Sequence, residues 1–136
     1  MVERIEWQDQ TLALIIRDQY QSEGVDFVTP RESSLQLGVI NRVRGESIKP
    51  HLHISSPRTI KDIQEVLHIK SGRVEAQFYD EDGHVLLSTV LNPGDTILLM
   101  SGGHGFSILE NARIIEVKQG PYQGIDQDKK RLETSE

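Results

Sequence analysis

Short apolar runs separated by turn residues dominate this sequence and limit the folds that it can adopt. The chain contains 11 glycines and 5 prolines, and no long amphipathic run of helical period lies between them. The apolar runs are rich in Val, Ile and Leu, which favours β-strands. They are LALIIR (12–17), LQLGVINRV (35–43), VEAQFYD (74–80), HVLLSTVL (84–91), DTILLM (95–100) and ARIIEVKQ (112–119). Strands joined by tight turns without helices between them predict an all-β sandwich or barrel.

Two tetrapeptides predict tight turns between these strands. DEDG lies between Tyr79 and His84, and its Gly83 can take the positive φ that a hairpin turn needs. NPGD at 92–95 has the composition of a second tight turn. No internal repeat divides the chain, so we expect a single domain.

One segment has two possible secondary structures. In residues 57–72, three aliphatic side chains recur at helical spacing between a proline and a glycine that can bound a helix: Ile60, Ile63 and Leu67. As a strand, residues 62–70 place Glu65 on one face together with Ile63, Leu67 and Ile69. We favour the strand and keep the helix as the alternative.

The composition argues against several functional classes. There are 15 Lys and Arg against 21 Asp and Glu, a net charge of -6, whereas nucleic-acid binding needs a basic surface. No apolar run is long enough to cross a bilayer, and the N-terminal MVERIEWQDQ is charged, unlike a secretory signal. The chain has no cysteine, which excludes disulfides and thiolate metal sites. We therefore expect a cytoplasmic protein that contacts neither nucleic acid nor a membrane.

Three histidines and one glutamate stand out as candidate ligands. If His51 and His53 lie on a strand, both side chains point to one side. An ionised Glu65 on an apolar face costs several kcal/mol unless it is paired or bound to a metal. A shared cation would offset that cost, and first-row divalent metals accept such nitrogen and oxygen ligands. His104, in the glycine-rich SGGHGF predicted as a loop, is a fourth candidate.

Each of these residues also has an ordinary structural interpretation. A His-x-His pair at a strand end is often a solvated surface pair, and a glutamate on a helix often pairs with a lysine, here Lys61 or Lys70. His104 alone would be an ordinary loop histidine. We expect His68 and His84 to be structural or solvent exposed, since the first alternates away from the glutamate and the second lies in the hairpin turn.

The same residues resemble the first motif of the cupin superfamily, G(x)5HxH(x)3–4E(x)6G. Its first half is matched by Gly45, the five residues ESIKP, and then His51 and His53. Its second half is matched by Glu65, the six residues VLHIKS, and Gly72. The chain departs from the pattern between the halves, where ISSPRTIKDIQ replaces the usual three or four residues. We interpret this segment as a lengthened loop.

The second cupin motif, G(x)5PxG(x)2H(x)3N, is matched only in part. Gly94 and Gly102 fit, but Met100 stands at the proline position. His104 comes one residue early and Asn111 later than the pattern asks. The specificity of the resemblance therefore comes from the first motif.

The resemblance covers about residues 35–119 and implies a fold. Cupins are small jelly-roll barrels, also called double-stranded β-helices, with a metal held inside one end. We accordingly expect a single cupin domain over 1–136, with an N-terminal strand region at 1–34 and a polar C-terminal tail at 124–136. Many small cupins are dimers, and RIEWQDQTLALIIR is a strand candidate with a large apolar residue, Trp7, and no evident hairpin partner. A homodimer is therefore expected.

The resemblance also implies a metal site and a function. The ligands would be His51, His53, Glu65 and His104, holding Fe, Mn, Zn or Ni with about two positions open on an octahedral ion. The function would be that of a small metal-dependent enzyme acting on a polar metabolite. Sugars, sugar-nucleotides and oxo-acids fit, by isomerase, epimerase or dioxygenase chemistry.

Two alternatives remain open, because a fold does not fix a function. The first is a non-catalytic ligand-binding or sensory cupin, and the second is a purely structural barrel. The strand at 112–119 places Glu116 and Lys118 on one face. Gln119 is on the other face. Whichever face turns inward would supply an acid, a base or a hydrogen-bond donor near the metal, and the alternative is an edge or outer face with solvated charges.

Overall fold

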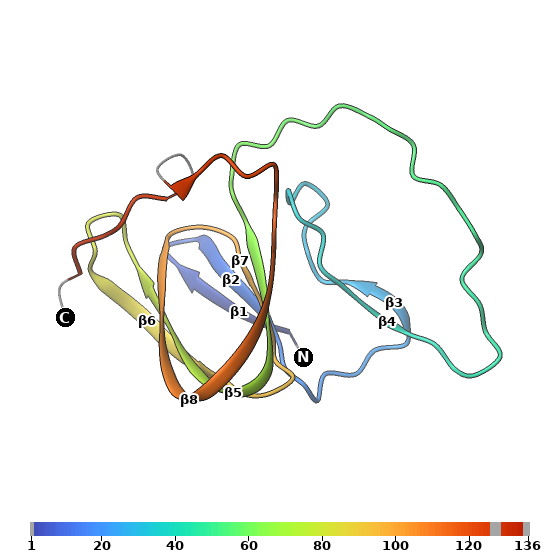
Figure 1. Cartoon of the computed structure of the whole chain (residues 1–136), viewed down its shortest axis with the longest axis horizontal. Coiled ribbons are helices and arrows are strands. Elements are labelled where there is room, and N and C mark those ends of the chain that lie inside the picture. The colour runs from blue at the N-terminus through green and yellow to red at the C-terminus, as the bar shows by residue number, and fades with distance from the viewer. Residues whose placement is uncertain (1, 126–128, 135–136) are drawn as a thin grey trace.

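The protein folds as a curled antiparallel β-sheet that forms a half-barrel (Figure 1). The computed structural model describes residues 2–125 and 129–134. In the main sheet the strand order is β1-β2-β7-β5-β6, with β8 paired to β5, while β3 and β4 form a separate two-stranded sheet. The strands are β1 (Val2–Trp7), β2 (Gln10–Ile16), β3 (Gly24–Phe27), β4 (Gly38–Asn41), β5 (Glu65–Tyr79), β6 (Val85–Leu91), β7 (Thr96–Leu99) and β8 (Gly103–Lys118).

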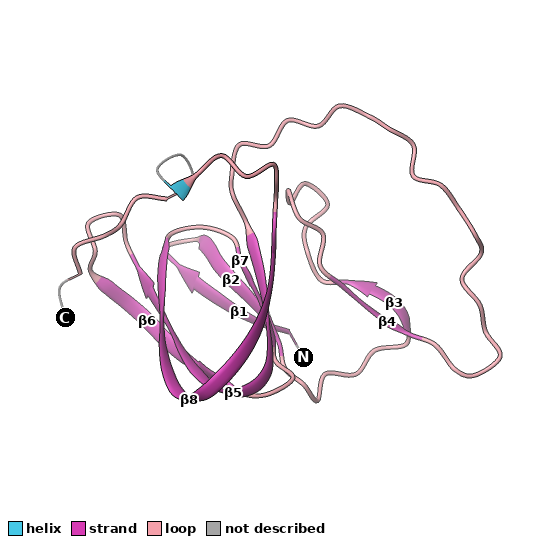
Figure 2. Cartoon of the chain, in the orientation of Figure 1, coloured by secondary structure: helices cyan, strands magenta, loops and turns pink. Residues whose placement is uncertain are grey.

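The all-β prediction is confirmed, because every strand predicted from an apolar run overlaps an observed strand (Figure 2). Both predicted turns are also present, with φ values of 87° at Gly83 and 90° at Gly94. The ambiguous segment is a strand from Glu65 onward, and the helical alternative is wrong. No helix among the described residues is long and apolar enough to span a membrane.

The N-terminal segment is a hairpin, which corrects the expectation that it lacks a hairpin partner. β1 pairs with β2 from Val2↔Ile16 to Trp7↔Gln10. The turn between them consists of Gln8 and Asp9, both at positive φ (49° and 63°). β2 in turn pairs with β7. The reason given from the sequence for a dimer through this segment therefore does not hold.

β5 and β8 pair along almost their whole lengths, from Glu65↔Lys118 to Tyr79↔Gly103. The register shifts repeatedly between Ile69 and Val74. Such bulges bend a strand and increase its twist. Gly72 lies in this bend at a φ of 83°, and a Cβ on it would lie 2.2 Å from the Asn111 carbonyl oxygen. The bend therefore requires glycine, and it curls the β5–β8 ribbon into the wall of the half-barrel.

The bend also changes which residues of β5 face the core. Before it, odd-numbered residues are buried (Leu67 and Ile69), whereas after it the even-numbered residues are buried (Val74, Ala76 and Phe78). These side chains pack with those of β2, β6 and β7 in one apolar core, which includes Leu12, Ala13, Ile15, Leu91, Ile97 and Leu99. The core thus fills the concave side of the sheet.

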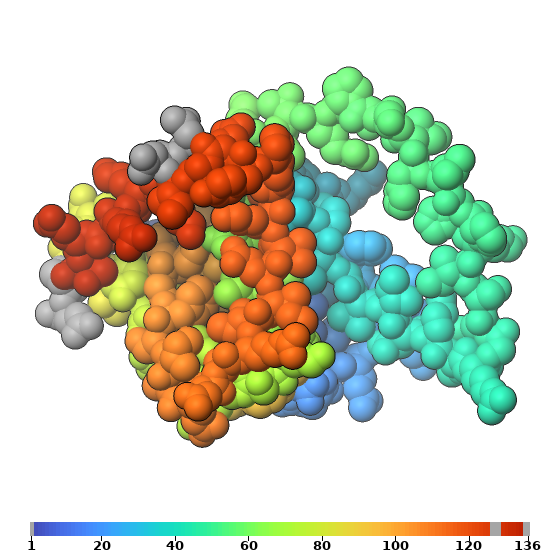
Figure 3. Space-filling model, in the orientation of Figure 1, coloured from blue at the N-terminus to red at the C-terminus, as the bar shows by residue number. Residues whose placement is uncertain are grey.

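Residues 42–63, which we call the arm, form a long irregular connection between β4 and β5. Every residue of the arm is exposed, and none is in a strand. In Figure 3 the arm is a single thread of residues that stands off from the rest of the molecule. The predicted lengthened loop is therefore part of a longer one, and the structure places neither His51 nor His53 on a strand.

Hydrogen bonds fix the end of the arm where it joins β5. The buried Gln64 accepts hydrogen bonds from the Ser33 hydroxyl and the Leu35 amide, each at 3.1 Å. The Gln64 amide donates to Gln119 at 2.8 Å, and the Gln119 side chain donates to Ser34 at 2.9 Å. The arm therefore leaves the half-barrel from a rigid base.

We predict that Gly72→Ala will destabilise the fold by more than about 1 kcal/mol, because a Cβ at positive φ is strained and here also meets backbone. Thermal unfolding followed by circular dichroism measures the effect. Gly124→Ala is the matched control, since Gly124 shares the positive φ (93°) but has nothing within 4 Å of its Cβ position. Equal melting temperatures for the two variants would contradict the proposed role of the β5–β8 bend.

Candidate functional site

A cluster of polar side chains lies at one end of the concave face. Residues directly opposite each other in an antiparallel pair share a face. His104 lies opposite the core residue Phe78, Glu116 opposite the core residue Leu67, and Lys118 opposite Glu65. All four polar residues, Glu65, His104, Glu116 and Lys118, therefore face the concave side; we call them the polar cluster.

The curl of the ribbon brings opposite ends of β8 together. Glu65 Oε1 lies 3.3 Å from His104 Nε2, although His104 is at the start of β8 and Glu65 pairs with its end. The Glu65 and His104 side chains are 15% and 31% exposed, so the pair is partly shielded from water. The His104 ring also lies 5.9 Å from that of Phe106, centroid to centroid. His104 was predicted in a loop; it is instead in a strand, which fixes its direction.

The two carboxyl groups of the cluster have opposite pKa shifts. The hydrogen bond with His104 lowers the pKa of Glu65 to about 2, against the opposing effect of burial. The hydrogen bond with Glu65, together with burial, raises the pKa of Glu116. Two carboxyl groups share a hydrogen bond only when one holds a proton. The cluster therefore favours ionisation of Glu65 and disfavours ionisation of Glu116.

The structure brings together two of the four residues predicted as ligands. Glu65 and His104 are in contact, whereas His51 and His53 lie on the exposed arm, with their ring centroids 5.2 Å apart. His51 Nδ1 contacts the Lys49 carbonyl oxygen at 2.8 Å. The four-ligand set thus remains a prediction, because one chain alone does not bring His51 and His53 to the Glu65–His104 pair.

The distance between Glu65 and His104 suits two neighbouring ligands of one metal ion. Metal–ligand bonds of about 2.0–2.2 Å place neighbouring ligand atoms about 3.0–3.4 Å apart. The 3.3 Å between Glu65 Oε1 and His104 Nε2 is in this range. Glu116 supplies a further carboxyl group next to Glu65, but its oxygens do not lie within 4.8 Å of both Glu65 and His104. This mixture of nitrogen and oxygen donors suits first-row divalent ions.

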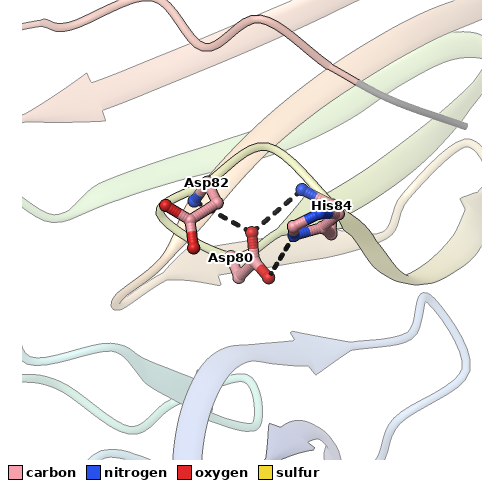
Figure 4. A group of neighbouring side chains, drawn as sticks. All are labelled: Asp80, Asp82 and His84. Carbon is pink, nitrogen blue, oxygen red and sulfur yellow. Dashed lines mark hydrogen bonds and ion pairs between the residues drawn. The ribbon is translucent and has the colours of Figure 1, made fainter.

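A second group of potential ligands lies in the β5–β6 hairpin turn (Figure 4). Ligand atoms of Asp80, Asp82 and His84 lie within 4.8 Å of one another, the single group of three or more such residues in the described part of the chain. His84 was predicted to be structural or solvent exposed in the hairpin turn, and the sequence-based hypothesis for a metal site did not include these three residues. The signal was DEDGH, two aspartates and a histidine within five residues.

The hydrogen bonds of this hairpin explain its geometry without an ion. Asp80 Oδ1 accepts hydrogen bonds from the backbone amides of Asp82 and His84, both at 2.9 Å. Asp80 Oδ2 lies 3.0 Å from His84 Nδ1. These bonds lower the pKa of Asp80, and the bond from the His84 backbone amide has the largest effect. An aspartate that caps a turn in this way is common.

Two cavities lie outside the polar cluster. One, of about 370 Å³, lies between the loop at 30–34 and the base of the arm, with Gln64 and Met100 in its lining. The other, of about 330 Å³, is lined by Glu75, Gln77, Tyr79, Val85 and Ser88. The lining of neither cavity includes a residue of the polar cluster.

Comparison with known proteins adds no relative. No protein-family model matches the sequence, and neither the curated proteins nor the solved structures gave a match. A function can therefore be inferred only from the residues of this chain and their arrangement.

We predict that Glu116→Gln will remove a loss of stability that occurs as the pH rises. Folding raises the pKa of the Glu116 carboxyl group above its value of 4.5 in the unfolded chain. The group therefore stabilises the fold at pH values below 4.5, and this stabilisation is lost as the pH rises through the pKa of the folded chain. Glutamine retains an N–H donor for Glu65 but does not titrate. Urea unfolding of chelator-treated protein between about pH 4 and 8 measures the effect.

The control for this prediction is Glu110→Gln. Glu110 is on the same strand and pairs with Arg73 at 3.3 Å, on the exposed surface. We expect this variant to keep the pH dependence of the parent. If both variants show the same pH dependence, Glu116 is not the group responsible.

Proposed function

We propose that the protein is a metal-binding β-barrel protein of the cupin type. Its divalent ion, Fe, Mn, Zn or Ni, would be held by Glu65 and His104, with His51 and His53 completing the ligand set. The observation that carries the proposal is the 3.3 Å contact between Glu65 and His104 on the concave face. It joins a carboxylate from the first motif and an imidazole from the partly matched second motif, which the resemblance implied would share a site.

The charges of the polar cluster support a cation at this place. Glu65 lies close enough to Glu116 to raise the pKa of the Glu116 carboxyl group. A divalent ion would stabilise both carboxylates and favour the ionisation of Glu116. Metal binding to protonated ligands releases protons and therefore weakens at low pH.

The proposed activity is that of a small metal-dependent enzyme acting on a polar metabolite, a sugar, a sugar-nucleotide or an oxo-acid. A bound ion would supply Lewis-acid polarisation of a substrate oxygen. Glu116 adjoins Glu65, so its carboxyl group is placed beside the proposed ligands, where it could act as a general acid or base. Isomerase, epimerase and dioxygenase chemistry all fit this arrangement. The alternative is a non-catalytic ligand-binding or sensory protein with the same ion.

The location and partners follow from the same proposal. A small-molecule ligand is the expected partner, and the acidic net charge of -6 disfavours nucleic acid. A cytoplasmic location is consistent with the absence of cysteine.

We predict that the protein binds one divalent ion per chain and that Glu65→Gln and His104→Ala each weaken binding by at least about tenfold, since each removes one ligand. Isothermal titration of chelator-treated protein with Zn²⁺ or Mn²⁺ measures the affinity. Circular dichroism of each variant establishes that the fold is intact.

His84→Ala is the control, and it separates the two candidate sites. Removing His84 leaves the polar cluster untouched but takes one ligand atom from the hairpin group. We expect this variant to bind as the parent does. Loss of binding in His84→Ala, with retention in His104→Ala, would assign the ion to the hairpin and reject the proposal.

We also predict that the bound ion remains open to added ligands, because four protein ligands do not saturate a six-coordinate ion. Addition of a 2-oxo acid or a vicinal diol to the cobalt-substituted protein should change its visible spectrum, with saturation at one donor per metal. An unchanged spectrum with every donor would indicate a closed, structural ion and would favour the non-catalytic alternative.

A further inference from the structure

The chain exposes more surface than a compact protein of its size. Its accessible surface is 10207 Å² for a mass of 15.4 kDa. A compact monomer of this mass exposes about 7,200 Å², so the excess is about 3,000 Å². Stable obligate dimers bury about 2,000–5,000 Å² or more in total. An excess of this size on each chain is enough for such an interface.

Much of the exposed apolar surface belongs to the arm. Its six large aliphatic side chains are between 46% and 93% exposed: Val43, Ile48, Leu52, Ile54, Ile60 and Ile63. A long connection without secondary structure inside a small domain is uncommon unless it has a function. The hydrogen bonds of the arm are local, as between Val43 and Glu46 and between His51 and Lys49, or lie at its base. Its apolar side chains therefore need another surface to cover them.

β8 offers such a surface next to the polar cluster. Among the described residues β8 pairs with β5 alone, so its other edge has no strand partner. Near its end both faces are open, since Ile115 and Val117 are 47% and 56% exposed and Glu116 on the opposite face is also exposed. An unpaired edge with exposed aliphatic residues is a template for another strand.

The charges of the arm and of the remainder of the chain are complementary. The arm has five basic and two acidic residues, a net charge of +3. Since the whole chain has a net charge of -6, the remainder has -9. Complementary charge therefore favours association of the arm with the acidic remainder of a second copy.

We propose that the arm of one chain lies along β8 of a second copy, so that a symmetric dimer exchanges arms. In each chain the arm extends away from its own open strand, and both surfaces stay exposed (Figures 1 and 3). That is the form of a protomer in a domain-swapped dimer. His51 and His53 of the arm then complete the Glu65–His104 site of the other chain, a consequence that rests on the proposed function.

The first test is the mass of the protein in solution. Light scattering should give twice the mass of one chain for the parent. Leu52→Asp combined with Ile54→Asp should give a monomer, because both side chains would be buried in the exchanged arm. Ser55→Asp combined with Ser56→Asp adds the same charge at polar positions of the arm and should remain dimeric. A monomeric parent, or a dimer unaffected by the Leu52 and Ile54 substitutions, would overturn the proposal.

The second test distinguishes exchange from an arm that folds back on its own chain. One chain carries His51→Ala and His53→Ala, the other carries Glu65→Gln and His104→Ala, and the heterodimer is isolated through two affinity tags. Exchange leaves one complete site per heterodimer, so it should hold half the metal of the parent, whereas each variant alone should hold little. A heterodimer without metal, beside a parent that binds it, would reject exchange while leaving the proposed function intact.

A third test does not depend on metal. The chain has no cysteine, so Leu52→Cys in one tagged chain and Ile115→Cys in the other provide unique sites for a short bismaleimide reagent. Mass spectrometry should find the peptides of positions 52 and 115 linked between chains. Absence of this link would overturn the exchange. Its presence in a protein that binds no metal would support the exchange and reject the proposed function.

Discussion

The pairing of β5 with β8 is the constraint on which the rest of this structure depends. It forms one wall of the half-barrel and carries the register that turns His104, Glu116 and Lys118 toward the concave face. A slip of one residue would move all three to the outer face, because side chains alternate along a strand. The bend at Gly72 then brings the two ends of the ribbon together, so the site depends on a glycine that contributes no side chain to it.

The parts of the fold that local patterns determine could be predicted from the sequence. The apolar runs marked the strands, glycines marked the turns at Gly83 and Gly94, and alternation placed Glu65 with Leu67 and Ile69. The bulges between Ile69 and Val74 could not be predicted, since they arise from pairing with a distant strand. The glycines around His104 suggested a loop, but that segment pairs with β5 as part of β8. The first hairpin was missed because its turn, Gln8–Asp9, has no glycine.

The candidate site, like the fold, could be predicted from the sequence only in part. Sequence spacing selected Glu65 and His104, which the fold brings into contact, but it also placed His51 and His53 on a strand that the structure does not contain. The resemblance implies which residues would share a site, whereas the path of the chain determines whether their side chains come into contact. For Glu116 the uncertainty was which face of the strand turns inward. The register with β5 answers that question, and no local pattern could have done so.

Two groups of buried or half-buried charges in this chain are arranged differently, and the difference bears on function. At Arg17, the guanidinium bonds to Glu3 and Asp95, and Asp95 also accepts hydrogen bonds from the Asp18 and Asn92 amides. Every charge there has a partner of opposite sign or a donor, which is the form of a structural network. In the polar cluster, Glu65 contacts His104 and lies opposite Lys118, but a second carboxyl group, that of Glu116, adjoins Glu65 and has a raised pKa. The proximity of Glu65 makes ionisation of Glu116 less favourable in the folded chain, so a cation bound between the two carboxylates would stabilise both the fold and the site.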